Sequence, residues 1–161
     1  MASTTFSGPV TSTNGFIGNL TGNVTGNVTG NVTGNVAGTG KITHATTAAI
    51  NATATATAAQ VATGYITSTS AAATAITLPT GTLLGAALGA VQGTVFDLYV
   101  DNTAGASTVT MAVAVNGILS SAAADTPGSF GDLTIAAGAT GIARFTLMFA
   151  SATAYVFTRT A

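Results

Sequence analysis

The apolar and polar positions near the start of the chain repeat with a period of four residues. From Gly18 the chain reads GNLT, GNVT, GNVT, GNVT, GNVA and GTG. An α-helix is disfavoured here, because each glycine inside a helix costs about 1 kcal/mol. A collagen-type helix is excluded, because it needs glycine at every third residue together with proline. Side chains of a strand alternate between two faces. The repeat therefore predicts an extended strand with Gly and Val or Leu on one face and Asn and Thr on the other.

The apolar side chains of this repeat form a seam that has no partner within a single chain. An isolated strand also leaves its backbone N–H and C=O groups unpaired. Copies winding together about a common axis would meet both needs, since glycine permits the backbones to approach closely. We therefore predict that residues 1–40 form an extended arm that assembles as a homotrimeric β stalk, with a plain Gly/Asn/Thr linker as the alternative. The predicted trimer seam is Leu20, Val24, Val28, Val32 and Val36.

Four bulky apolar residues precede the repeat, and they are the only ones in that part of the arm. They are Phe6, Val10, Phe16 and Ile17. Because a large apolar side chain on a thin arm has no core of its own to enter, we interpret these residues as anchors for a partner surface. A cap on the stalk is the alternative.

Beyond the arm, short apolar runs separated by turn residues predict a β-rich domain. Residues 41–60 form a hinge or first strand, with Ala and Thr alternating from Asn51 to Thr57, and residues 61–161 form the head domain. A helical turn is expected between Thr57 as N-cap and Gly64, and a short helix within residues 82–91. Breaks are expected at 101–105, Asn116-Gly117 and Pro127-Gly128. Strands are expected at Tyr65–Thr69, Ala75–Leu78, Val95–Asp101, Thr108–Val115, Leu133–Ala136, Ile142–Phe149 and Ala154–Thr158. The predicted fold class is all-β, an extended arm followed by a small β-sandwich or jelly-roll-like domain.

Charge is unusually scarce along the whole chain. Charged residues make up 4% of it and the formal net charge is −1, whereas soluble domains carry roughly 25% charged residues. Little repulsion then separates copies, so we expect burial in an assembly. The few basic residues cannot neutralise a phosphate backbone, so no nucleic-acid partner is expected. No segment is long and apolar enough to span a membrane, and no secretory signal is visible at the start. Synthesis in a host cytoplasm is expected.

Few residues offer chemistry. His44 is the only histidine, and we interpret it as a solvated hinge residue. Asp97 and Asp101 share a strand face and form the candidate carboxylate pair for acid–base work, but Asp101 lies at a turn, where Asp usually accepts backbone N–H bonds. Arg144 and Arg159 are expected to pair with Asp97 or with Asp132. We therefore expect no enzyme, no catalytic residue, no cofactor and no metal.

Two stretches carry a resemblance to a known family. The opening FSGPVTSTNGFIGNLTGNVTGNVTGNVTGNV resembles the N-terminal arms of tailed-phage virion proteins. The later ITLPTGTLLGAALGAVQGTVFDLYVDNTAGASTVTM and AGATGIARFTLMFASATAYVF resemble the β-rich head domains of capsid decoration (cement) and fibre proteins. The resemblance implies a homotrimer on the capsid exterior of a virion, with the arm contacting the major capsid protein or forming a stalk.

The expected function is that of a cement protein, which binds the assembled phage head and stabilises it. The alternative is a tail or head fibre that recognises a host surface. That role needs a pocket with exposed aromatic residues, and the three tyrosines all lie within predicted strands. A hydrolase of cell-wall polymers and a bacterial surface adhesin are weaker alternatives, since the chain has no Glu and no visible export signal.

Overall fold

The computed structural model describes residues 44, 46–119 and 133–160. The chain divides into two compact units, Met1–Gly40 and Lys41–Ala161, and all described residues belong to the second. The predicted seam and the predicted anchors of the arm lie outside the described residues and stay predictions. So do Asp132 and the Pro127-Gly128 turn.

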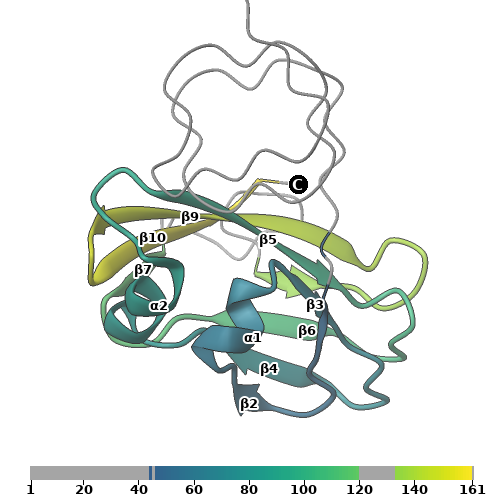
Figure 1. Cartoon of the computed structure of the whole chain (residues 1–161). Coiled ribbons are helices and arrows are strands. Elements are labelled where there is room, and N and C mark those ends of the chain that lie inside the picture. Colours follow the sequence, from purple (N-terminus) through teal and green to yellow (C-terminus); the bar gives the residue numbers. More distant parts are fainter. Residues whose placement is uncertain (1–43, 45, 120–132, 161) are drawn as a thin grey trace, which may run out of the picture. The chain divides into compact units, whose positions relative to one another are not determined.

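Strands dominate the described part of the second unit (Figure 1). The two helices found there are α1 (Ala58–Ala62) and α2 (Gly81–Leu88). The strands are β1 (Ala48–Ala49), β2 (Ala54–Thr55), β3 (Tyr65–Thr67), β4 (Thr74–Thr77), β5 (Val95–Asp101), β6 (Val109–Ala112), β7 (Gly117–Leu119), β8 (Thr134–Ile135), β9 (Ile142–Ser151) and β10 (Ala154–Arg159). The expectation of a β-rich unit with few helices is confirmed for these residues.

Successive strands alternate between two sheets from β1 to β8. One sheet has six strands in the order β1-β3-β5-β9-β10-β7, and the other has four in the order β2-β4-β6-β8. Each pass of the chain through β1–β2, β3–β4 and β5–β6 therefore adds one strand to each sheet, which makes these neighbours parallel. The long β9–β10 hairpin then adds antiparallel pairs. This mixed pairing differs from the antiparallel pairing of a jelly roll, because the chain returns to the first sheet without reversing direction.

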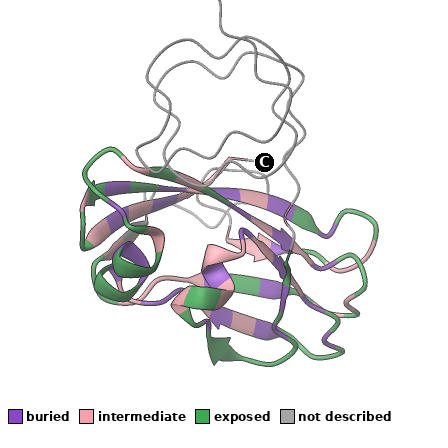
Figure 2. Cartoon of the chain, in the orientation of Figure 1, coloured by how far each residue is buried: buried purple, intermediate pink, exposed green. Residues whose placement is uncertain are grey.

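The core lies between the two sheets, which Figure 1 shows one above the other. Alternate residues of β9 are buried, and Phe145 stacks on Phe157 of β10 with ring centroids 4.8 Å apart. Figure 2 shows the same alternation as bands of buried and exposed residues along the strands. Tyr155 is also buried, its hydroxyl donates to the carbonyl oxygen of Pro79 at 3.0 Å, and burial raises the pKa of its phenol to about 12. The sheets are thus held by one continuous apolar cluster.

Both short helices appear near their expected positions, α1 at its predicted N-cap and α2 one residue before the expected range. Thr57 is the N-cap of α1 and forms a capping box with Gln60, in which each side chain accepts a backbone N–H. Thr80 caps α2, which ends at Gly89 with a left-handed φ of 59°. A Cβ at Gly85 would overlap the carbonyl oxygen of Ala152 in the β9–β10 turn, so glycine lets this helix pack closely on the sheet. Neither described helix could cross a membrane.

Most predicted strands appear with shifted ends. The prediction for β5 is confirmed residue by residue, whereas β6 ends at Ala112 rather than continuing to Val115. Strand β7 was not predicted, because a three-residue strand has too little pattern to detect. It exists through its parallel pairing with β10 at the sheet edge.

Candidate binding groove

The outer face of the six-stranded sheet carries the side chains that face away from the core. On β5, Leu98 and Val100 are fully buried, whereas Val95, Asp97 and Tyr99 alternate with them and are exposed or half-buried. The neighbouring strands are in register, with Tyr65 of β3 beside Tyr99 and Asp97 beside Thr146 of β9. Strand parity therefore gathers polar and aromatic groups on this face.

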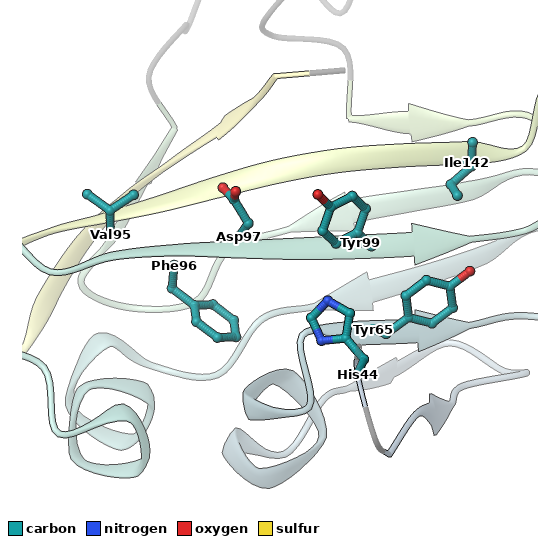
Figure 3. A pocket seen from close by; sticks show the side chains of 7 residues that line it. All are labelled: His44, Tyr65, Val95, Phe96, Asp97, Tyr99 and Ile142. Atoms are coloured by element: carbon teal, nitrogen blue, oxygen red, sulfur yellow. The ribbon is translucent and has the colours of Figure 1, made fainter. Parts of the chain in front are cut away.

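Three rings form a cluster on this face. The phenol rings of Tyr65 and Tyr99 have centroids 6.4 Å apart and planes inclined by 22°. The imidazole of His44 lies 6.0 Å from the first ring and 5.7 Å from the second. Next to them is a groove of about 530 Å³ (Figure 3). It is lined by His44, Tyr65, Val95, Phe96, Asp97, Tyr99 and Ile142.

The lining residues of the groove come from both sides of β5. In Figure 3, Asp97 and Tyr99 rise on one side of the β5 ribbon, and Phe96 points to the other side. Strand β3 pairs only with the last three residues of β5, from Tyr99 onward. The stretch of β5 before Tyr99 is therefore not covered by β3, and the groove extends along it.

The backbone around residue 64 fixes the position of His44. Nδ1 of His44 lies 2.9 Å from the carbonyl oxygen of Thr63. A carbonyl can only accept, so Nδ1 carries the proton and donates it, which leaves Nε2 of the neutral ring as an acceptor. Gly64 has a φ of 74°, and a Cβ there would overlap the His44 ring. The interpretation of His44 as a solvated hinge residue is therefore wrong, because the residue is half-buried against the sheet.

Asp101 is committed to internal hydrogen bonds. Its Oδ1 accepts the Thr103 hydroxyl at 2.6 Å and the Thr103 backbone N–H at 2.9 Å. Its Oδ2 accepts the Tyr65 hydroxyl at 2.8 Å. The Thr103 hydroxyl is the main cause that lowers the pKa of Asp101, and the bond to Asp101 raises the pKa of Tyr65. The prediction that this aspartate satisfies turn donors is confirmed.

Asp97 has a different environment from Asp101. Its Oδ1 accepts the Thr146 hydroxyl at 2.6 Å, and no other hydrogen bond to its carboxylate is found within the described ranges. The expected ion pair with Arg144 is absent between these two described residues, because the Arg144 guanidinium turns to the Thr160 hydroxyl at 3.1 Å. Arg159 donates to the Thr134 carbonyl oxygen at 3.0 Å. Among the described residues, the two aspartates therefore have no hydrogen-bond partner in common.

The arrangement suits binding through aromatic faces and hydrogen-bond acceptors. Among the residues that the structure describes, no group of three or more His, Cys, Asp or Glu could hold a metal ion. The sequence missed the groove because Tyr65 and Tyr99 belong to strands that are far apart in the chain. The parity of β5 was the available signal, since it already placed Tyr99 beside the two aspartates.

Searches with protein-family models, curated proteins and solved structures find no match to this chain.

Proposed function

We propose that this chain is a structural virion protein, a homotrimeric decoration or cement protein that binds the exterior of an assembled phage head. The observation that carries the proposal is the four-residue repeat with its one-sided seam of Leu and Val. Such a seam is stable only when it is covered, and copies of the same strand cover it best. The resemblance of the opening segment to tailed-phage virion arms supports the same role. The proposal includes no catalytic step and no cofactor.

The described unit is consistent with a protein that functions within an assembly. Its two-sheet core is a β-sandwich in the broad sense. Large apolar side chains stay exposed on its six-stranded sheet, among them Val95 at 62% and Met148 at 50%. These two residues are register partners on adjacent strands. A surface with so few charges and with paired apolar side chains favours contact with other protein.

The stabilising mechanism is thermodynamic linkage. A protein that binds the assembled shell and not its free subunits stabilises the shell in proportion to the binding free energy. A homotrimer presents its arms together, so that later contacts are intramolecular and affinity rises through effective concentration. In this proposal Phe6, Val10, Phe16 and Ile17 contact the major capsid protein.

The first test is the oligomeric state of the full-length chain, measured by multi-angle light scattering. We expect a trimer, and a clean monomer at micromolar concentration would contradict the stalk. Replacing Val24, Val28 and Val32 together with Asp should dissociate the trimer, because each change places a charge in the seam. The matched control replaces Thr25, Thr29 and Thr33 with Asp on the opposite strand face and should leave the trimer intact.

The second test concerns the shell. Heads assembled without the protein should release their contents at a lower temperature than heads to which the purified trimer has been added back. Electron microscopy of the same particles should show added density on the capsid. An unchanged release temperature with the trimer bound would contradict the cement role, and density on the tail would favour the fibre.

A fibre that recognises a host surface is the second candidate. The observation that favours it is the position of Tyr65 and Tyr99, which lie side by side at a groove although both are strand residues. The sequence argued against a fibre because all three tyrosines lie within predicted strands. Tyr65 and Tyr99 are strand residues and nevertheless line the groove.

A further inference from the structure

We propose that the groove beside β5 is a saccharide-binding site, in which a sugar ring packs on Tyr99 and Tyr65 and its hydroxyls donate to Asp97 and His44. Ligand sites are typically concave, mostly apolar and 300–1,000 Å³ in volume, with a few polar groups that fix orientation. The groove has a volume of about 530 Å³. Its lining side chains are tyrosine, phenylalanine or aliphatic, except for His44 and Asp97.

The apolar part of the site consists of phenol rings. Tyr65 and Tyr99 are nearly parallel, are half-buried and belong to adjacent strands in register. A tyrosine ring combines an apolar face with a polar edge, and a pyranose likewise combines an apolar C–H face with hydroxyls around its rim. A sugar can therefore lay its C–H face on the rings and turn its hydroxyls to the polar groups nearby.

The polar groups of the groove are acceptors. Thr146 occupies Oδ1 of Asp97, and Oδ2 has no partner within the part of the chain that the structure describes. In the neutral His44 ring Nε2 is an acceptor, because Nδ1 donates to the carbonyl oxygen of Thr63. A ligand that satisfies both must bring donors, and sugar hydroxyls provide them. The Tyr99 hydroxyl can donate or accept, and it forms no hydrogen bond with any described residue.

The site is held in place before a ligand arrives. The Tyr65 hydroxyl is fixed by Asp101, which is itself fixed by Thr103. The His44 ring is fixed by its bond to Thr63 and by the space that Gly64 leaves. Side chains that are already ordered lose little conformational entropy on binding. The turn beside Asp101 thus supports the groove without lining it.

Two other ligand classes fit less well. An anion would face the carboxylate of Asp97 without a cation among the lining residues. A quaternary ammonium would gain from the ring faces and from Asp97, but such ligands favour rings that enclose them, and these two phenols are nearly parallel. A neutral saccharide therefore fits best.

Intrinsic tyrosine fluorescence of the full-length protein provides a direct test. The chain has three tyrosines and no tryptophan, and two of the tyrosines line the groove. The probes are glucose, galactose, N-acetylglucosamine, maltose, lactose and chitobiose, each titrated to high millimolar concentration, with choline chloride as the cationic probe. We expect a saturable change with at least one saccharide. No change with any saccharide would overturn the proposal, and so would a saturable change with choline alone.

Variants then place the binding in the groove. Tyr99→Leu should weaken saccharide binding at least about tenfold, because it removes the ring face. Tyr99→Phe should stay within about threefold of the unchanged protein, because it keeps that face. Leu83→Ala, which truncates an exposed apolar side chain of α2 outside the groove, is the matched control and should have no effect. Isothermal calorimetry serves as the readout where a tyrosine is replaced. Unchanged binding by Tyr99→Leu would overturn the assignment.

Circular dichroism and thermal melting establish that each variant is folded. If Tyr99→Leu does not fold, Asp97→Asn tests the same groove, because Asp97 is exposed and its substitution should leave the fold intact. This variant should weaken saccharide binding about threefold or more. Unchanged affinity in Asp97→Asn would then overturn the proposal. The site does not require the cement function, and its failure would leave the trimer and shell experiments unaffected.

Discussion

The two ends of the outer face of β5 each carry an aspartate, and the two carboxylates differ in how many hydrogen bonds they accept. At the C-terminal end, Asp101 fills both carboxylate oxygens with donors from Tyr65 and Thr103. The next residue, Asn102, is fully buried and bonds to a second loop. At the N-terminal end, Asp97 has one donor, from Thr146, and stands at a groove.

This difference separates stability from binding along one strand. Polar groups that are satisfied internally rigidify a fold but offer nothing to a ligand. A half-satisfied carboxylate next to half-buried rings contributes little to stability and can bind a ligand. Substitutions at the Asp101 end should therefore affect unfolding, and substitutions at the Asp97 end should affect ligand binding.

The largest effect is expected at Asn102. Its amide nitrogen donates to the carbonyl oxygens of Ser107 at 2.8 Å and Ala136 at 2.9 Å, while no described residue donates to its buried Oδ1. Asn102→Asp replaces these donors with a buried carboxylate facing carbonyls and should lower the free energy of unfolding by at least about 3 kcal/mol. Urea unfolding measures this change.

Asn51→Asp is the matched control for that substitution. The Asn51 side chain is exposed and uses its oxygen to accept the Thr69 backbone N–H, a bond that a carboxylate also makes. Its unfolding free energy should change by no more than about 0.5 kcal/mol. An equal loss of unfolding free energy in the two variants would contradict the claim that the buried amide of Asn102 contributes more to stability than the exposed amide of Asn51.

The next effect is expected at the base of the groove. Gly64→Ala should cost about 1–3 kcal/mol, because residue 64 has a left-handed φ and the new Cβ would overlap the His44 ring. Displacement of that ring should also weaken saccharide binding. Gly93→Ala is the control, since residue 93 also has a left-handed φ but its added Cβ meets no atom within 4 Å. Both variants should lose stability, and only the first should lose binding.

Asp101→Asn should have a smaller effect that depends on pH. At neutral pH the loss should be about 1 kcal/mol, since the amide can still accept one of the bonds. The pKa of Asp101 in the folded protein lies below its ordinary value of 3.8. The stability that this carboxylate contributes is therefore present above that value and is lost as the pH falls through the folded pKa. The difference between the two proteins should shrink in acid, as measured by thermal melting across pH; a constant difference would contradict it.

The smallest change in stability is expected for Asp97→Asn. The residue is exposed and the amide oxygen can still accept the Thr146 hydroxyl, so the free energy of unfolding should change by less than about 0.5 kcal/mol. Saccharide binding should nevertheless weaken. A loss of stability as large as that of Asp101→Asn would erase the contrast between the two ends of β5.

Local patterns predicted much of the described fold. Thr57 marked the start of α1, and strand parity placed Asp97 and Asp101 on one face of β5. These features were readable because capping and alternation depend on residues near one another in the sequence. The arm lies outside the described residues, and its seam remains a prediction from the repeat alone.

The sequence by itself determined the β-rich character of the unit, the Thr57 cap and the common strand face of Asp97 and Asp101. Only the tertiary structure decided that strands alternate between two sheets, and that His44 lies against Tyr65 and Tyr99. The physical reason is distance along the chain. Strand pairing is set by burial and backbone hydrogen bonding summed over the whole unit, so no local pattern records which strands become neighbours.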